Sequence, residues 1–180
     1  EAQDIVDAES KILAEFGRLT LERIDTIKIR NHGDYHLGQV LYTGNSFVIM
    51  DFEGEPARPL SERRLKHSCL RDVAGMVRSF HYAAHSALYQ QLTSSEDDLA
   101  YLASWIDPWF RAVSGMFLSA YQDAIMPSSL LPSNKKSMEL LFRCLMLEKA
   151  IYEVGYELNN RPSWLPIPVR GVKQLLAGEV

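Results

Sequence analysis

Two short segments of the sequence contain the residue types that phosphoryl transfer requires. Residues 31–39 include Asp34 and Gln39, and residues 50–53 include Asp51. In this reaction a protein orients the acceptor hydroxyl, holds Mg²⁺ against the phosphates and neutralises the charge that develops on the transferred group. Asp34 is the candidate general base for the hydroxyl. Gln39 and Asp51 are the candidate ligands of Mg²⁺ and, through the metal, of the nucleotide phosphates.

Local sequence patterns predict the elements that position these segments. Apolar residues at helical spacing indicate an amphipathic helix over roughly the first twenty residues. Ile27 and Ile29 alternate with basic residues, which predicts a short strand leading to His32. Residues 40–43 and 47–50 flank Gly44-Asn45, a pattern typical of a β-hairpin. We expect this hairpin to return Asp51 to the side of Asp34.

The chain after Pro56 and Pro59 is predicted to be helical. One helix is expected from Ser61 to about Leu92, with Leu65 on its apolar face. Ser94-Ser95, followed by acidic residues, indicates the start of a second helix. Pro108 lies inside that second pattern and predicts a bend or break near Asp107, and Pro127 and Pro132 are expected to end the helix.

A third long helix is predicted after Asn134 and Ser137, ending at Asn159-Asn160-Arg161-Pro162. A short helix from Val172 to Ala177 is expected to close the chain. The predicted fold is therefore mainly α with a small β-hairpin. Cys69 and Cys144 lie on apolar helical patterns far from any metal-binding spacing, so we expect them to be buried and reduced. His81 and His85 are one helical turn apart without an evident third metal ligand.

Composition limits the kinds of partner. A chain of 180 residues that is 47% hydrophobic fits one domain. A net charge of −4 without a basic block predicts neither nucleic acid nor an anionic membrane as partner. The sequence has no apolar run of about 20 residues and no signal peptide pattern, which favours a cytoplasmic location. The start at Glu1 and the lack of a Gly-rich phosphate loop suggest a fragment.

The order of the candidate residues resembles that of kinases. Their catalytic loop contains an Asp and, five residues later, an amide ligand of Mg²⁺, followed across a hairpin by a second metal-binding Asp. Asp34, Gln39 and Asp51 have this order. Gly33 stands where protein kinases have Arg, Gln39 replaces Asn, and Asp51-Phe52-Glu53 replaces Asp-Phe-Gly. These departures resemble the kinases of small molecules, the aminoglycoside and choline phosphotransferase-like group.

Within that group the chain resembles the bacterial maltokinases, which are often fused to trehalose synthase. Four blocks in the same order carry the resemblance: residues 31–39, 50–56, 70–80 and 159–162. The resemblance implies that residues 1–180 are the helical C-terminal catalytic lobe of a protein-kinase-like fold. The chain's own N-terminal lobe, absent here, would hold most of the nucleotide, and the fragment alone would be inactive.

The same resemblance implies an activity and its partners. The protein would use ATP and Mg²⁺ to phosphorylate maltose at its anomeric hydroxyl, giving maltose 1-phosphate. A trehalose synthase, fused or associated, is a further expected partner. Two alternatives stay open. The same chemistry could act on another sugar, choline or an aminoglycoside, or the helical chain could be a docking or regulatory module without catalysis.

Three further residues near the loop have expected roles. Glu53 could ligate a second Mg²⁺ or only accept hydrogen bonds from the backbone. His32 could donate a hydrogen bond to the sugar or brace the loop that contains Asp34. Asp72 lies on an apolar helical face, where a buried carboxylate needs donors. Because kinase-like folds use such an Asp to hold the catalytic loop, we expect Asp72 to be structural.

Two sets of residues are candidates for binding the acceptor. Lys149, Tyr152 and Tyr156 share one face of the third long helix, where they could contact a sugar or form a solvated face. The segment 148–153 resembles the sugar-binding helix of maltokinases. Tyr101, Trp105 and Trp109, spaced four apart, could stack on a sugar ring, although such a stripe is also typical of a protein core.

Overall fold

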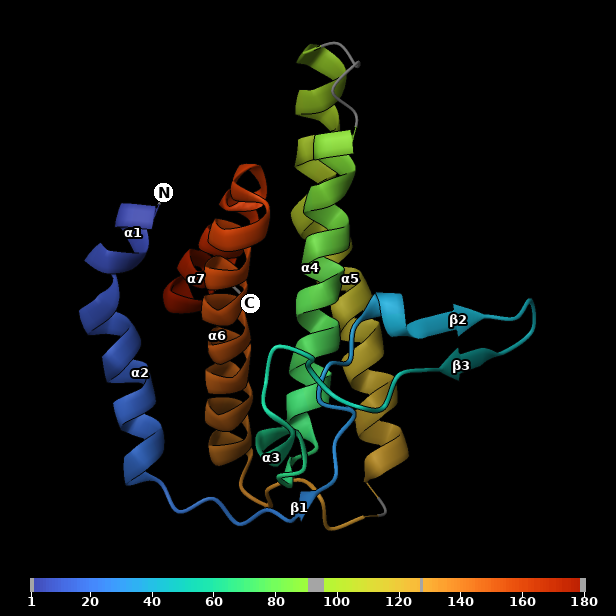
Figure 1. The fold of residues 1–180 in the computed structure, drawn as a ribbon, viewed down its shortest axis with the longest axis vertical. Helices are drawn as coiled ribbons and strands as arrows, with labels where there is room; N and C mark the ends of the chain where they lie inside the picture. Colours follow the sequence, from blue (N-terminus) through green and yellow to red (C-terminus); the bar gives the residue numbers. More distant parts are fainter. Residues whose placement is uncertain (1, 91–95, 127, 179–180) are drawn as a thin grey trace.

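A computed structural model describes residues 2–90, 96–126 and 128–178 of the chain. Three long helices lie side by side: α4 (Leu70–Gln90) packs between α5 (Glu96–Ile125) and α6 (Lys135–Asn160) (Figure 1). The predicted fold class, mainly α with a small hairpin, is confirmed. No helix within the described ranges is both long and apolar enough to span a membrane.

The shorter helices cover the outer side of α6. The N-terminal pair, α1 (Ala2–Asp7) and α2 (Glu9–Leu21), lies beside α6 and α7 (Pro166–Ala177), as Figure 1 shows. The short 3-10 helix η2 (Pro162–Trp164) connects α6 to α7. The predicted single helix over the first residues is therefore two helices with a junction at Ala8.

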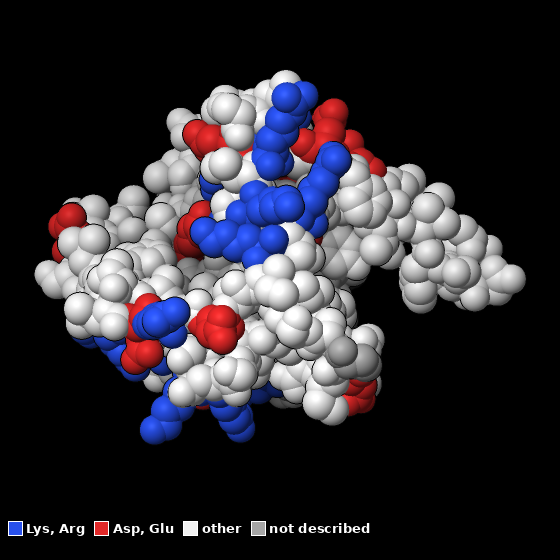
Figure 2. Space-filling model, turned by 90° about the horizontal axis from the view of Figure 1, so that it is seen from below, with Lys and Arg blue, Asp and Glu red and all other residues white. Residues whose placement is uncertain are grey.

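The strands form two separate two-stranded sheets. β1 (Lys28–Ile29) pairs antiparallel with β4 (His67–Ser68). After the 3-10 helix η1 (Leu37–Gln39), β2 (Val40–Tyr42) pairs with β3 (Phe47–Ile49), as predicted. This hairpin projects sideways from the helical body (Figure 1), and Figure 2 shows the projection without charged side chains. Every residue of β3 is exposed.

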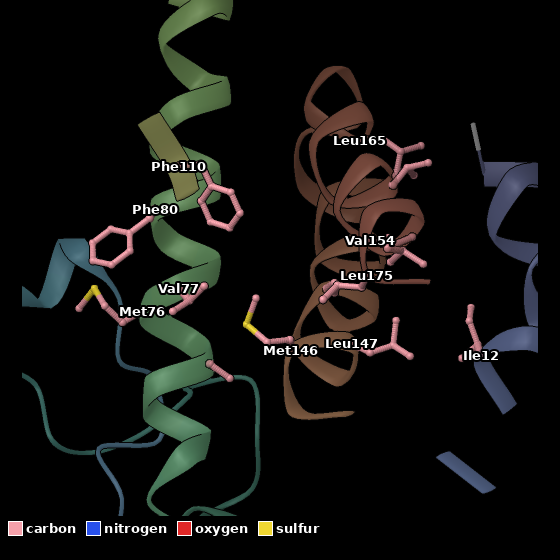
Figure 3. Close-up of a cluster of buried hydrophobic side chains, with 14 residues drawn as sticks. Ile12, Met76, Val77, Phe80, Phe110, Met146, Leu147, Val154, Leu165 and Leu175 are labelled. Carbon is pink, nitrogen blue, oxygen red and sulfur yellow. The ribbon is translucent and has the colours of Figure 1, made fainter. Parts of the chain in front are cut away.

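The hydrophobic core lies between the helices. Val77 on α4 and Met146 on α6 point toward one another, and Ile12 on α2 faces the side of α6 that carries Leu147 (Figure 3). Phe80 and Phe110 belong to the same cluster and join α5 to it. Burial of such side chains is worth about 1.5–3 kcal/mol each. The long helices thus form a rigid body against which the shorter segments can be positioned.

The predicted helix from Ser61 to Leu92 is wrong in its first part. The structure has a short helix α3 (Leu60–Arg63), then strand β4, and only then α4. The strand forms because His67 pairs with Ile29, a partner distant in the sequence. Leu65, expected on the buried face, is 56% exposed.

The predicted break at Pro108 is also absent, since α5 continues from Glu96 to Ile125. Buried Ile106 and Phe110 flank the proline, so packing on both sides can offset the cost of about 3 kcal/mol for an interior proline. The last helix, α7, begins at Pro166 rather than at Val172. Cys69 and Cys144 are buried free thiols, as expected. The boundaries predicted at Leu92, Ser94-Ser95 and Pro127 lie outside the described residues.

The start of α6 agrees with the capping prediction. Asn134 is the N-cap residue, and its side-chain oxygen accepts hydrogen bonds from the backbone N–H groups of Lys136 and Ser137 at 2.9 and 3.3 Å. These bonds satisfy donors that have no partner inside the helix. The cap fixes where α6 begins and hence which of its residues face α4.

Candidate active site

The loop that contains Asp34 is fixed to α4 through its backbone. The Asp72 carboxylate accepts hydrogen bonds from His32 N–H at 2.7 Å and from Gly33 N–H at 2.9 Å. The predicted structural role of Asp72 is therefore confirmed. The Tyr35 carbonyl oxygen lies against Gly75, where an added Cβ would approach it to 2.7 Å. α4 thus sets the position of the loop directly.

The backbone conformation at position 33 explains why this chain has Gly33 where protein kinases have Arg. Its φ angle is +88°, a conformation that side chains other than glycine rarely adopt. An added Cβ would also lie 3.1 Å from the Cα atom of Gly54. The loop therefore passes too close to the following segment for an arginine at position 33.

Asp34 lies in a shielded and positively charged environment. Its Oδ1 atom is 3.4 Å from Lys149 Nζ, and its Oδ2 atom is 3.6 Å from His36 Nε2. Burial by itself would raise the pKa of Asp34, but the hydrogen bond from His36 and the charge of Lys149 outweigh it and lower the pKa to about 2. Asp34 is therefore ionised at neutral pH and can accept a hydrogen bond from a hydroxyl.

The face of α6 that was predicted to bind the acceptor lines a cavity of about 600 Å³ next to Asp34. Lys149, Tyr152 and Tyr156 all contribute to its wall. Lys149 Nζ also lies 5.1 Å from the centre of the Tyr152 ring. Burial, together with the nearby Glu55 carboxylate, raises the pKa of Tyr152 to about 12, so its hydroxyl remains protonated.

The two predicted metal ligands lie together at the base of the hairpin. Gln39 Nε2 donates a hydrogen bond to Asp51 Oδ2 at 3.3 Å, which leaves Gln39 Oε1 and Asp51 Oδ1 available. Asp51 has a φ angle of +63°, unique among the described residues other than glycine. Such strained conformations are concentrated at functional sites. An amide and a carboxylate oxygen fit Mg²⁺, which commonly takes its remaining ligands from water and phosphates.

The structure distinguishes the two roles considered for His32. The ring is buried, and its Nε2 atom lies 2.7 Å from the Met50 carbonyl oxygen. It also lies 4.8 Å, centre to centre, from the Phe52 ring. His32 therefore braces the Asp34 loop against the end of the hairpin and does not line the cavity. This contact joins the two halves of the candidate site.

The structure does not bring Glu53 into a metal cluster. Glu53 is exposed, and its carbonyl oxygen accepts a hydrogen bond from Arg63. Throughout the described part of the chain, no three His, Cys, Asp or Glu side chains are grouped so that they could hold an ion. Metal binding by Gln39 and Asp51 would therefore depend on the nucleotide for further ligands, and ligation by Glu53 stays a prediction.

Several residues of the cavity were not singled out in the sequence. Glu55 Oε2 lies 3.9 Å from Lys149 Nζ, which also pairs with Asp34. Glu157 accepts hydrogen bonds from Arg161 at 2.7 Å and from the Tyr82 hydroxyl at 3.1 Å. Residues 149, 153 and 157 are four apart on α6, so helical spacing was a usable signal for the two glutamates. Glu55 had no such signal.

A buried ion pair supports this wall of the cavity from behind. Arg78, on α4, donates two hydrogen bonds to Glu153 Oε2 on α6, at 2.9 and 2.7 Å. The guanidinium is fully buried and lies so close to Gly171 of α7 that an added Cβ would come within 2.2 Å of Nη1. Three helices therefore meet at this pair.

The aromatic stripe on α5 lies elsewhere. Trp105 and Trp109 line a separate apolar groove of about 380 Å³ between α4 and α5, together with Leu88 and Leu102. Tyr101 is 64% exposed and packs edge-on against Trp105. The structure does not place these three aromatic residues at the cavity next to Asp34, although the sequence analysis considered them as sugar contacts.

Sequence comparison finds relatives among sugar kinases. The chain is 31% identical over 149 residues to a glucosamine kinase of Mycolicibacterium smegmatis, covering 82% of this chain and 34% of the relative. It is 26% identical over 145 residues to a glucosamine kinase of Streptacidiphilus jiangxiensis, covering 81% of this chain and 31% of the relative. The chain thus spans about a third of the length of these relatives. No family model matches it.

Solved structures show the same fold. A glucosamine kinase in complex with glucosamine, ADP and inorganic phosphate aligns with 98% of this chain and 42% of its own length, with a TM-score of 0.78 and 23% identity. A second crystal form of a glucosamine kinase aligns with 99% of the chain at a TM-score of 0.75 and 22% identity. The chain therefore has the fold of the corresponding part of these kinases.

Proposed function

We propose that this chain forms the acceptor-binding and metal-binding part of an ATP-dependent sugar kinase. The observation that carries the proposal is the anchored Asp34 in the wall of the large cavity. His32 joins its loop to Met50, the residue before Asp51, which lies beside Gln39. The similarity to glucosamine kinases over four fifths of the chain supports it. We further propose that most of the nucleotide is held by a part of the protein outside these 180 residues.

The ion pair with Lys149 lowers the basicity of Asp34 and thereby determines its role in the proposed reaction. A carboxylate with a pKa of about 2 is a weak proton acceptor, so its main contribution is to orient the acceptor hydroxyl toward the phosphate. This suits phosphoryl transfer, where positioning and charge stabilisation dominate. The hydroxyl would donate to Asp34 while Lys149 keeps the carboxylate ionised. When bound, Mg²⁺ would neutralise phosphate charge at Gln39 and Asp51.

Glucosamine is the acceptor that we propose first. The relatives are glucosamine kinases, and the cavity has more acidic than basic side chains on its wall. Two of its carboxylates are held by arginines, Glu153 by Arg78 and Glu157 by Arg161. Glu55 has no arginine partner among the described residues; its ion pair is with Lys149, at 3.9 Å, and its side chain also bonds to Tyr152. We therefore propose Glu55 as the carboxylate that receives the ammonium group of an amino sugar.

Maltose is the second candidate. The four sequence blocks that resemble maltokinases favour it, and the cavity of about 600 Å³ has room for a disaccharide. The relatives named above are glucosamine kinases rather than maltokinases. Maltose 1-phosphate as product, and a trehalose synthase as partner, thus stay predictions from the sequence resemblance.

A substrate panel tests the proposal. The full-length protein that contains this chain would be incubated with Mg²⁺ and ATP, and with glucosamine, maltose, glucose, choline or an aminoglycoside as acceptor. Preference for glucosamine supports the first candidate and preference for maltose the second. Preference for choline or an aminoglycoside would overturn the sugar assignment. Absence of ATP-dependent product with every acceptor would favour the non-catalytic alternative.

Tyr152→Phe tests whether this face of α6 binds the acceptor. Loss of one buried hydroxyl partner costs about 1–3 kcal/mol, so we expect the KM for the sugar to rise roughly 5- to 150-fold while the KM for ATP changes little. Tyr101→Phe on α5, outside the cavity, is the matched control and should leave both constants unchanged. An equal effect of the two substitutions would contradict the assignment.

A further inference from the structure

The segment between β3 and α3 brings Glu55 into the wall of the large cavity. Figure 1 shows this segment returning from the hairpin to the helical body, where it passes beside α6. The contact of Glu55 Oε2 with Lys149 Nζ, at 3.9 Å, is longer than that of Asp34 with the same lysine, at 3.4 Å. An ion pair of this length holds a carboxylate loosely, so the position of Glu55 depends on how the rest of the segment is attached.

A tight turn connects Glu55 to Arg58. The Arg58 backbone N–H donates a hydrogen bond to the Glu55 carbonyl oxygen at 3.0 Å, which is the bond typical of a β-turn. Inside the turn, the Ala57 backbone N–H donates to Glu55 Oε1 at 3.5 Å. Fixing Arg58 therefore also limits where the Glu55 carboxylate can lie.

Glu148 of α6 binds Arg58 to the helical body. Its Oε1 atom accepts hydrogen bonds from Arg71 Nη2 at 2.8 Å and from Arg58 Nη2 at 3.4 Å, and its Oε2 atom accepts one from Arg71 Nη1 at 3.3 Å. Arg71 lies in the first turn of α4, so this two-bond contact fixes the Glu148 carboxylate between two long helices. The pair of Arg58 with Glu62, at 3.7 Å, attaches Arg58 only to α3.

Arg58 also contacts a residue that we propose to bind the acceptor. Its Cζ atom lies 6.0 Å from the centre of the Tyr152 ring, within the range of a cation–π contact. The Tyr152 side chain in turn bonds to Glu55. Arg58 is therefore connected to Glu55 in two ways, through the backbone of the turn and through the Tyr152 side chain.

Arg58 does not itself neutralise Glu55. Among the described residues, the carboxylates within 4.0 Å of the Arg58 guanidinium are those of Glu62 and Glu148. Because Glu148 binds the guanidinium, the negative charge of Glu55 remains available to a cationic group in the cavity.

We propose that Arg58 is a positioning residue of the acceptor site. Held by Glu148, it keeps the turn in the place from which Glu55 can receive the ammonium group of an amino sugar. This inference rests on the proposed function and identifies what would select an amino sugar over a neutral one. Because Asp34 is fixed separately through its own loop, Arg58 should affect recognition of the amino group rather than phosphoryl transfer.

Arg58→Gln in the full-length protein tests the positioning role. Loss of a well-placed bond to the ammonium group should raise the KM for glucosamine about 5- to 50-fold, with kcat and the KM for ATP changed by less than about 2-fold. Glucose, measured as substrate or as competitor, has no ammonium group and should be affected by less than about 2-fold. Arg58→Lys keeps the charge and should recover part of the loss. Arg64→Gln, at an exposed neighbour outside the cavity wall, is the matched control and should leave all constants unchanged.

Glu148→Gln tests whether Arg58 acts through this glutamate. We expect the same rise in the KM for glucosamine, and the double variant with Arg58→Gln should be little worse than either single variant, because both remove one contact. Additive effects would overturn the inference. Equal losses for glucosamine and glucose, the pattern expected from a general loss of stability, would also overturn it.

The parent protein separates failure of this inference from failure of the proposed function. A parent protein that phosphorylates no sugar would overturn both. An active parent protein that does not prefer glucosamine to glucose, or whose preference survives Arg58→Gln, would overturn this inference and leave the sugar kinase proposal standing.

Discussion

The loop that contains Asp34 and the hairpin that leads to Asp51 are held by the molecule in different ways. The loop is attached to α4 by hydrogen bonds from two backbone N–H groups to Asp72 and by the contact of Tyr35 with Gly75. The hairpin projects from the body, and the side chains of Tyr42 and Phe47 are 62% and 68% exposed. Its main link to the loop is the bond between His32 and the Met50 carbonyl oxygen.

This difference separates two requirements of the proposed reaction. An acceptor hydroxyl must meet a carboxylate whose position is already fixed, and rigid neighbouring helices provide that. Metal ligands can be completed by the nucleotide itself, so the hairpin need not be rigid before the nucleotide binds. The comparison predicts that substitutions in the loop and its anchors have large effects, while substitutions on the hairpin surface have small effects on stability.

The largest expected effect is that of Asp34→Asn on activity. Removing the carboxylate that orients the acceptor hydroxyl should lower turnover about 10²-fold or more, and we expect this for sugar phosphorylation by the full-length protein. The pKa of Asp34 is lowered from 3.8 to about 2, so the carboxylate is ionised above about pH 4, and the stability from its pair with Lys149 is lost as the pH falls through 2.

Turnover and thermal unfolding of this variant would be measured together. Because the pair with Lys149 is partly exposed, the free energy of unfolding should fall by no more than about 1 kcal/mol. Turnover within a few-fold of the parent protein would show that the fixed loop has no catalytic role.

Asp72→Asn tests the anchor itself. The amide keeps one acceptor oxygen and directs an NH₂ group at a backbone donor, so one charge-assisted hydrogen bond is lost and one N–H is left unpaired. We expect a loss of about 2–3 kcal/mol in the free energy of unfolding, measured by chemical denaturation, with a fall in turnover. Asp123→Asn, at an exposed position on α5, is the control and should change stability by less than about 0.5 kcal/mol.

Gly75→Ala tests the close approach of the loop to α4. The new methyl group would lie 2.7 Å from the Tyr35 carbonyl oxygen, and backbone on both sides resists displacement. We expect a loss of about 1–3 kcal/mol. The matched control is Gly115→Ala on α5, where nothing lies within 4 Å of the added atom. There the change should stabilise the protein by up to about 1 kcal/mol, and equal losses at the two sites would contradict the steric argument.

Local patterns predicted those parts of the fold that local physics determines. The hairpin was correct because alternation and Gly44 specify a reversal, and the Asn134 cap was correct because its side chain bonds only to neighbouring residues. The break in the helix predicted from Ser61 was missed because β4 exists only through its pairing with β1. A strand of two residues has no periodicity to detect.

For the candidate site, too, local sequence patterns predict only those contacts that local physics determines. Asp72 could be predicted because a carboxylate on an apolar helical face must find donors. Glu55 could not, because its place beside Lys149 depends on how the segment after the hairpin folds back over α6. For Trp105 and Trp109, spacing identified a shared face of α5 but not which groove that face would line.

The smallest expected effect is at the hairpin surface. Phe47 is 68% exposed and contacts Tyr42 across the strands, with ring centres 5.2 Å apart. Because an exposed side chain buries little area, Phe47→Ala should lower the free energy of unfolding by less than about 0.5 kcal/mol. Phe80→Ala in the core, where the ring is 8% exposed, should cost about 3–5 kcal/mol in the same denaturation experiment. A loss above about 1 kcal/mol for Phe47→Ala would show that the hairpin is held as firmly as the loop, and the contrast between the two halves of the site would no longer hold.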